Sequence, residues 1–113
     1  MTYLAADIGG TKTLLGVFSW EGIPIKNYQK RYLSSDWNSL EPILLDFLGN
    51  LPKGIKNPTT GCLALAGPVT NGKCKLTNLK WNLCQHEICN AIGLNSIELI
   101  NDIEQEFQVL FSN

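Results

Sequence analysis

The glycine pair Gly9-Gly10 places the strongest constraint on how this chain can fold. Residues 3–8 before it are mostly apolar, and residues 11–20 after it are again apolar and rich in β-branched and aromatic side chains. Two such segments on either side of a glycine turn predict an antiparallel β-hairpin. Residues 25–33 alternate loosely between apolar and polar, which predicts a third strand with one exposed face. We therefore expect the chain to begin with three antiparallel strands.

Helices and strands alternate in the rest of the predicted structure. A helix is expected to begin at Leu40, with Asp36 or Ser39 as its N-cap, and to end before Pro52. The other predicted elements are strands over 61–66, 73–77 and 97–100, and helices over 85–92 and 102–111. Antiparallel strands that lead into strand–helix–strand units predict an α/β fold with one mixed sheet flanked by helices.

Length and composition narrow the class of protein. The 113 residues suffice for one ordinary domain. Nine basic side chains stand against ten acidic ones, so neither nucleic acid nor an anionic membrane is an expected partner. Apolar runs are too short to cross a bilayer and no secretion signal begins the chain, so we expect a cytoplasmic protein. No two of the four cysteines have the CxxC spacing, and we expect all four to be reduced and partly buried.

The glycine turn is the first candidate functional site. Glycines let backbone N–H groups approach phosphate oxygens with no Cβ in the way, and threonine hydroxyls add donors. A carboxylate at the end of the preceding strand can hold a water of hydrated Mg²⁺. The alternative is a plain hairpin turn in which the glycines only supply positive φ. The candidate phosphate-binding residues are Asp7, Gly9, Gly10, Thr11, Lys12 and Thr13, with Asp7 also binding Mg²⁺ through water.

The pair Asn101-Asp102 is the second candidate, because it directly follows the apolar strand predicted over 97–100. Ligands of α/β folds usually bind at such strand ends. The Asp102 carboxylate could accept a proton from a substrate hydroxyl that attacks a phosphoryl group, while Asn101 fixes the sugar by hydrogen bonds. The alternative is that Asp102 only caps the helix that begins there.

Two loops form the third candidate, residues 66–69 and residues 77–81. Thr77 and Asn78 offer uncharged hydrogen-bonding groups beside the indole of Trp81. Sugars favour such surroundings, since amides and hydroxyls pair with sugar hydroxyls while an aromatic surface covers the C–H face of the ring. Ordinary loop structure explains each residue equally well in isolation.

Taken together and in order, these segments resemble the bacterial glucokinase family, of the sugar kinase, Hsp70 and actin superfamily. The matching residues are 7–13, 66–69, 76–81 and 99–102. The resemblance implies a ribonuclease H-like mixed sheet, three antiparallel strands followed by parallel strands, that forms one half of an actin-like ATPase fold. It also implies ATP and Mg²⁺ as cofactors, and glucose or a related hexose as the substrate phosphorylated in the first step of glycolysis.

The resemblance also implies roles for individual residues. The glycine turn would face the β- and γ-phosphates of ATP. Asp102 would be the general base that deprotonates the 6-hydroxyl of the sugar, and Asn101 would bind a neighbouring hydroxyl. Thr77 and Asn78 would line the sugar side of the cleft.

Members of this family continue into a second, larger domain, so residues 1–113 are expected to be the small N-terminal domain, with the C-terminal large domain absent and little activity on its own. The apolar stripe Ile103, Phe107 and Leu110 is then expected to be partly exposed or buried by self-association. Two alternatives are a non-enzymatic, sugar-responsive regulator and a stand-alone interaction domain on the same fold.

Overall fold

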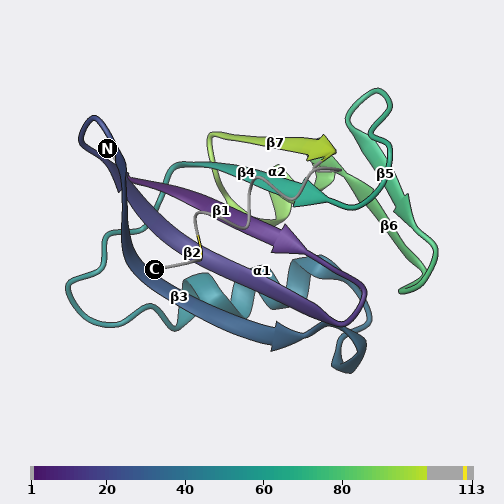
Figure 1. The fold of residues 1–113 in the computed structure, drawn as a ribbon, viewed down its shortest axis with the longest axis horizontal. Helices are drawn as coiled ribbons and strands as arrows, with labels where there is room; N and C mark the ends of the chain where they lie inside the picture. Colours follow the sequence, from purple (N-terminus) through teal and green to yellow (C-terminus); the bar gives the residue numbers. More distant parts are fainter. Residues whose placement is uncertain (1, 102–110, 112–113) are drawn as a thin grey trace.

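A mixed sheet of five strands organises the chain, in the order β3-β2-β1-β4-β7 (Figure 1). This computed structural model describes residues 2–101 and residue 111. The antiparallel strands are β1 (Thr2–Ile8), β2 (Lys12–Trp20) and β3 (Pro24–Leu33). The strands β4 (Thr60–Leu65) and β7 (Ser96–Asn101) run parallel to β1. The predicted mixed sheet, with three antiparallel strands followed by parallel ones, is confirmed.

Two helices cover one face of the sheet, α1 (Leu40–Gly49) and α2 (Gln85–Ile92) (Figure 1). The apolar side of α1 packs with alternate residues of the central strands into one buried core. Both helices begin where the sequence predicts. Ser39 is the N-cap of α1, whereas Asp36 belongs to a short 3₁₀ turn, η1 (Ser34–Asp36).

A separate two-stranded sheet joins β5 (Lys73–Leu76) to β6 (Trp81–Cys84). The sequence predicts β5 but not β6, which has four residues and directly follows Lys80, a turn residue with a φ of 58°. Residues 77–80 form the turn that connects the two strands, closed by a hydrogen bond of 3.3 Å from the Lys80 N–H to the Thr77 carbonyl.

An aromatic cluster lies on the face of the sheet opposite the helices. The rings of Tyr3 and Phe18 stack at 5.7 Å, and Phe111 meets Phe18 edge-on at 5.5 Å. Gly16 leaves room for this contact, because a Cβ there would lie 3.1 Å from the Phe111 ring. The predicted last helix with its stripe of Ile103, Phe107 and Leu110 lies outside the described residues. No helix within those residues is long and apolar enough to cross a membrane.

Candidate functional site

The carboxyl ends of the parallel strands meet at one edge of the sheet. Ile8 pairs with Leu65, and Leu65 pairs in turn with Asn101. Asn101 therefore lies two strand spacings, about 10 Å, from the residue that precedes the glycine turn. The structure brings the first candidate motif and Asn101 to the same edge. Asp102, the predicted general base, follows directly in the sequence but lies outside the described residues.

The two glycines of the turn do not serve an unusual backbone conformation, and only at Gly9 is a Cβ sterically tight. Neither Gly9 nor Gly10 has a positive φ, so the expectation that a plain hairpin turn would need them to supply one is wrong. The Gly9 N–H donates to the Lys12 carbonyl at 3.0 Å, and a Cβ at Gly9 would lie only 3.1 Å from that oxygen. A Cβ at Gly10 would point toward Asn78, 3.6 Å from its side-chain nitrogen. Any larger residue at position 10 would therefore fill the space between the turn and Asn78.

Ser34 holds the turn from inside the fold. Its N–H donates to the Thr11 carbonyl at 2.9 Å, and its hydroxyl donates to the Gly9 carbonyl at 2.8 Å. The Thr13 hydroxyl lies 2.8 Å from the Ser34 hydroxyl. Because the single hydroxyl hydrogen of Ser34 is directed at Gly9, Thr13 is the donor in this pair. Both side chains are fully buried. Ser34 is not predicted from the sequence, because nothing local marks a serine that binds a turn 25 residues away.

These bonds leave the turn with an excess of donors. The carbonyls of Gly9, Thr11 and Lys12 all accept hydrogen bonds within the protein. The N–H groups of Gly10 and Thr11 have no partner in the described part of the chain, and both residues are exposed. Of the carbonyls of residues 9–12 only that of Gly10 accepts no hydrogen bond among the described residues, while two N–H groups are available, so the turn offers more backbone donors than acceptors to an anion. The direct contact predicted for Thr13 stays a prediction, since its hydroxyl hydrogen serves Ser34 here.

A pocket of about 380 Å³ adjoins the glycine turn, and we name it the turn pocket. Three separate segments line it, residues 8–10, 66–68 and 75–79. They include Gly9, Gly10, Thr77 and Asn78, so the pocket joins part of the first candidate motif to the third. Lys75 is the one charged side chain among its described lining residues.

Several of the predicted site residues do not line the turn pocket. Asp7, Thr11, Lys12 and Asn101 are not among the described residues that line it. The prediction that Trp81 offers an aromatic surface to a sugar is wrong, because this side chain is 2% exposed and belongs to the core. Trp81 is the first residue of β6 and lies on its buried face, so the indole packs inward, whereas an open loop was expected here.

One carboxylate near the turn, that of Asp7, is the candidate for holding a hydrated cation. Within the described residues, no group of three or more His, Cys, Asp or Glu side chains is placed to hold a metal ion directly. Mg²⁺ in phosphate sites keeps several waters and takes one or two carboxylates together with phosphate oxygens. Asp7, half-buried at the end of β1, is therefore compatible with the water-mediated contact that the sequence predicts.

Comparison with known proteins identifies the family. The family model for glucokinase matches residues 4–107. The glucokinase of Nostoc sp. is 39% identical over 108 residues, and that of Synechocystis sp. is 33% identical over 111 residues. These alignments cover 88% and 90% of this chain but only 29% and 31% of the relatives, so the chain spans about three tenths of their length.

Solved structures agree with this result. The crystal structure of glucokinase from an Antarctic psychrotroph has a TM-score of 0.80 and 33% identity, covering 89% of this chain and 32% of that one. A ROK family glucokinase from Streptomyces griseus, solved in complex with glucose and AMPPNP, has the same fold with a TM-score of 0.65 and 20% identity, covering 90% of this chain and 33% of that one. The mixed sheet and its two helices match one half of this actin-like fold. The chain belongs to the glucokinase family.

Proposed function

We propose that residues 1–113 are the small N-terminal domain of an ATP-dependent glucokinase and supply its phosphate-binding turn together with one side of its sugar site. The observation that carries the proposal is the turn pocket, in which a donor-rich glycine turn faces the neutral polar groups of Thr77 and Asn78. A phosphoryl donor needs hydrogen-bond donors and a sugar needs neutral polar groups, and the two sites must adjoin because transfer depends on holding both substrates in line.

On the phosphate side, the N–H groups of Gly10 and Thr11 bind phosphate oxygens of ATP, and the Lys12 ammonium adds positive charge. Asp7 orients a water of the Mg²⁺ that accompanies ATP. When bound, this ion neutralises charge on the phosphates. The hydrogen bonds from Ser34 fix the turn before the ligand arrives, so less ordering is required on binding.

On the sugar side, Thr77 and Asn78 hydrogen-bond hydroxyls of glucose. Asn101 holds a hydroxyl from the neighbouring strand end, and Asp102 accepts the proton of the 6-hydroxyl as that oxygen attacks the γ-phosphorus of ATP. Support comes from the shared sheet edge of Ile8 and Asn101 and from the family to which the chain belongs. The assignment of Asp102 rests on the family resemblance alone.

Ligand titration of the ¹⁵N-labelled 113-residue chain, followed by NMR, tests this proposal. AMPPNP with Mg²⁺ should shift the amide signals of residues 9–12, and glucose should shift those of residues 77–79. A chain that keeps the fold but serves only as an interaction domain would show neither set of shifts. Shifts from AMPPNP that avoid residues 9–12 would contradict the phosphate-binding role of the turn.

A further inference from the structure

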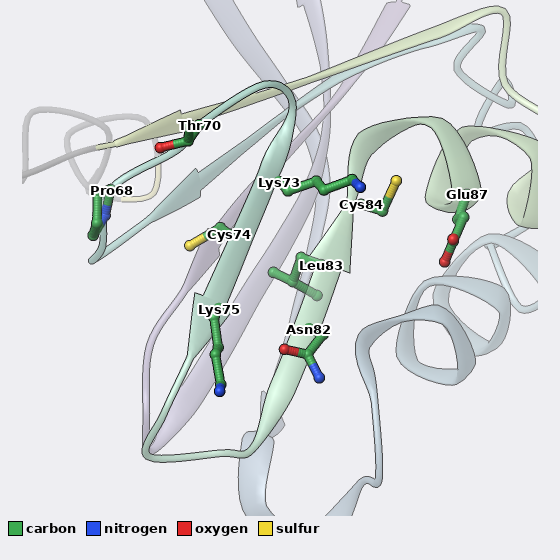
Figure 2. A pocket seen from close by; sticks show the side chains of 9 residues that line it. All are labelled: Pro68, Thr70, Lys73, Cys74, Lys75, Asn82, Leu83, Cys84 and Glu87. Carbon is green, nitrogen blue, oxygen red and sulfur yellow. The ribbon is translucent and has the colours of Figure 1, made fainter.

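The β5–β6 hairpin forms a sheet of its own, and within the described residues neither of its strands pairs with the five-stranded sheet. Its apolar side chains pack into the core, while Lys73, Lys75 and Asn82 are exposed on its outer face and border a pocket of about 480 Å³ (Figure 2). Its connecting turn carries Thr77 and Asn78, which line the turn pocket. The place of the hairpin relative to the sheet therefore decides where these two side chains lie, and ladder hydrogen bonds do not fix that place.

Gln85, the first residue of α2, links the hairpin to the five-stranded sheet by two hydrogen bonds. Its N–H donates to the Gly72 carbonyl at 2.8 Å, in the turn that leads into β5. Its side-chain oxygen Oε1 accepts the N–H of Leu99, in β7, at 3.1 Å. The side chain lies close over the turn, since a Cβ at Gly72 would be 3.4 Å from the Gln85 Cβ. One residue therefore connects the start of the hairpin to an edge strand of the main sheet.

Both hydrogen bonds supply a partner that regular secondary structure does not. β7 is an edge strand, so the N–H of Leu99 on its free side has no strand to pair with, and Leu99 is only 5% exposed to water. The N–H groups in the first turn of a helix also have no acceptor within the helix, and the N-cap residue Cys84 makes no side-chain hydrogen bond to them. Because an unmade bond of a buried group costs free energy, both bonds hold Gln85 in one arrangement.

The two elements that Gln85 joins are those that carry the predicted sugar-binding residues. Leu99 precedes Asn101 by two residues on β7, about 7 Å along the strand. Thr77 and Asn78 lie in the turn at the opposite end of the hairpin from Gln85, so a change of angle at Gln85 displaces them over the length of the hairpin. The hydrogen bonds of Gln85 are thus placed to set the distance between Asn101 and the hairpin turn.

We propose that Gln85 is a positioning residue of the sugar site, which holds the hairpin turn and the end of β7 at the separation that glucose requires. This inference rests on the proposed function, which assigns the sugar to these two elements. Gln85 is not among the described residues that line the turn pocket, so it acts through Thr77 and Asn78 and not by contact with the sugar. The glycine turn is held by Ser34, so binding of phosphates is independent of Gln85.

NMR titration of two ¹⁵N-labelled variants of the 113-residue chain with glucose, and separately with AMPPNP and Mg²⁺, tests the role of Gln85. Gln85→Met keeps the length of the side chain but removes the acceptor, so it should speed amide exchange at Leu99 and weaken glucose binding about tenfold. Gln85→Glu keeps an acceptor oxygen and should bind glucose within about twofold of the unchanged chain. AMPPNP binding should stay unchanged in both. The matched control is Gln29→Met, an exposed glutamine of β3, which should alter neither ligand's binding.

Two results would overturn the positioning role and leave the proposed function standing. One is unchanged glucose affinity in Gln85→Met, despite faster exchange at Leu99. The other is an equal loss of glucose and AMPPNP binding that Gln85→Glu does not restore, which would mean that Gln85 only supports the fold. Failure of the proposed function is seen separately in the unchanged chain, as glucose that does not shift the amide signals of residues 77–79, and the positioning role would be excluded with it.

Discussion

At the scale of single residues, Ser34 is the side chain on which the glycine turn most depends. It satisfies the carbonyls of Gly9 and Thr11 and accepts the hydroxyl hydrogen of Thr13, all inside the fold. A buried group that loses its partner costs more free energy than the bond itself contributes, because water cannot replace the lost partner. The shape of a surface turn is thus set by a residue that no ligand touches.

Ser34→Ala should lower the free energy of unfolding by about 1–3 kcal/mol, because the Gly9 carbonyl and the Thr13 hydroxyl lose their partner. Ser35→Ala is the matched control, an exposed neighbour with an expected effect within about 0.5 kcal/mol. Urea unfolding of both variants measures the difference. Equal midpoints for the two would show that the Ser34 hydroxyl does not support the turn.

Cys62 tests how burial and a nearby charge shift a pKa on the face of the sheet opposite the helices. Burial, together with the nearby Glu98 carboxylate, raises the pKa of the Cys62 thiol to about 11 from 9.0. The folded chain therefore holds this proton between pH 9 and 11 where the unfolded chain releases it, so the thiol's contribution to stability is complete below pH 9 and lost as the pH rises through 11.

The rate at which iodoacetamide alkylates Cys62 in the folded chain should accordingly rise about tenfold for each pH unit up to the neighbourhood of its pKa, since the thiolate is the nucleophile. Peptide mass spectrometry after timed quenching measures this rate for Cys62 alone. A rate that already levels off near pH 9 would mean that the thiol is not shielded as the structure indicates.

At the scale of elements, the edge strand β3 is tied to α1 by a polar contact. The Tyr32 hydroxyl donates to the Asp46 carboxylate at 2.6 Å, and Lys30 lies 3.6 Å from the same carboxylate oxygen. Burial and this carboxylate raise the pKa of Tyr32 well above its usual value, so the hydroxyl stays a donor across the working range of pH. The contact keeps the first helix aligned with the hairpin that carries the glycine turn.

Tyr32→Phe should reduce the free energy of unfolding by about 1–2 kcal/mol, because it removes a hydrogen bond to a charged group that is partly exposed. Tyr28→Phe is its control. Tyr28 lies on the same strand, its ring stacks on Phe47 at 5.7 Å, and the substitution keeps that ring. Thermal unfolding should separate the two variants, and a Tyr28→Phe effect as large as that of Tyr32→Phe would contradict a specific role for the hydroxyl.

The elements that the sequence predicted correctly are those with a local signal. Apolar segments around Gly9-Gly10 predict the hairpin, and α2 is confirmed from Gln85 to Ile92 because an amphipathic pattern stops at Gly93, which has the expected positive φ. β6 was missed because four residues are too few for periodicity to be recognised, although Trp81 and Leu83 do alternate inward. Tertiary packing decides such short strands.

In the candidate site, too, the parts with a local sequence signal could be predicted. The glycine turn, Thr77 and Asn78 meet at one pocket as the order of motifs in the family suggests. The contribution of Ser34 was not predictable, because it depends on β3 returning beside β2 and ending at the turn. A contact between residues far apart in the sequence produces no pattern in the residues next to either of them.

At the scale of the whole molecule, the proposed function makes the described residues one side of a cleft. The turn pocket is built from three segments of one small sheet and its hairpin, and the chain spans about three tenths of the relatives that it matches. Phosphoryl transfer needs water excluded and both substrates held in line, which requires surfaces on both sides of the cleft.

The 113-residue chain, assayed by itself with ATP, Mg²⁺ and glucose, should therefore show little or no phosphoryl transfer. A coupled assay that detects glucose 6-phosphate measures this, with a complete glucokinase as the positive control. Turnover at an ordinary glucokinase rate would show that the described surfaces suffice for catalysis.

Binding of the phosphates of ATP by the glycine turn is tested most directly by adding one methyl group to the turn. Gly10→Ala fits the backbone but directs its Cβ toward Asn78, whereas Gly49→Ala adds the same group where nothing lies within 4 Å. In NMR titrations with AMPPNP and Mg²⁺, we predict that Gly10→Ala weakens binding about tenfold or more while Gly49→Ala binds as the unchanged chain does. Equal affinity in the two variants would contradict phosphate binding by the glycine turn.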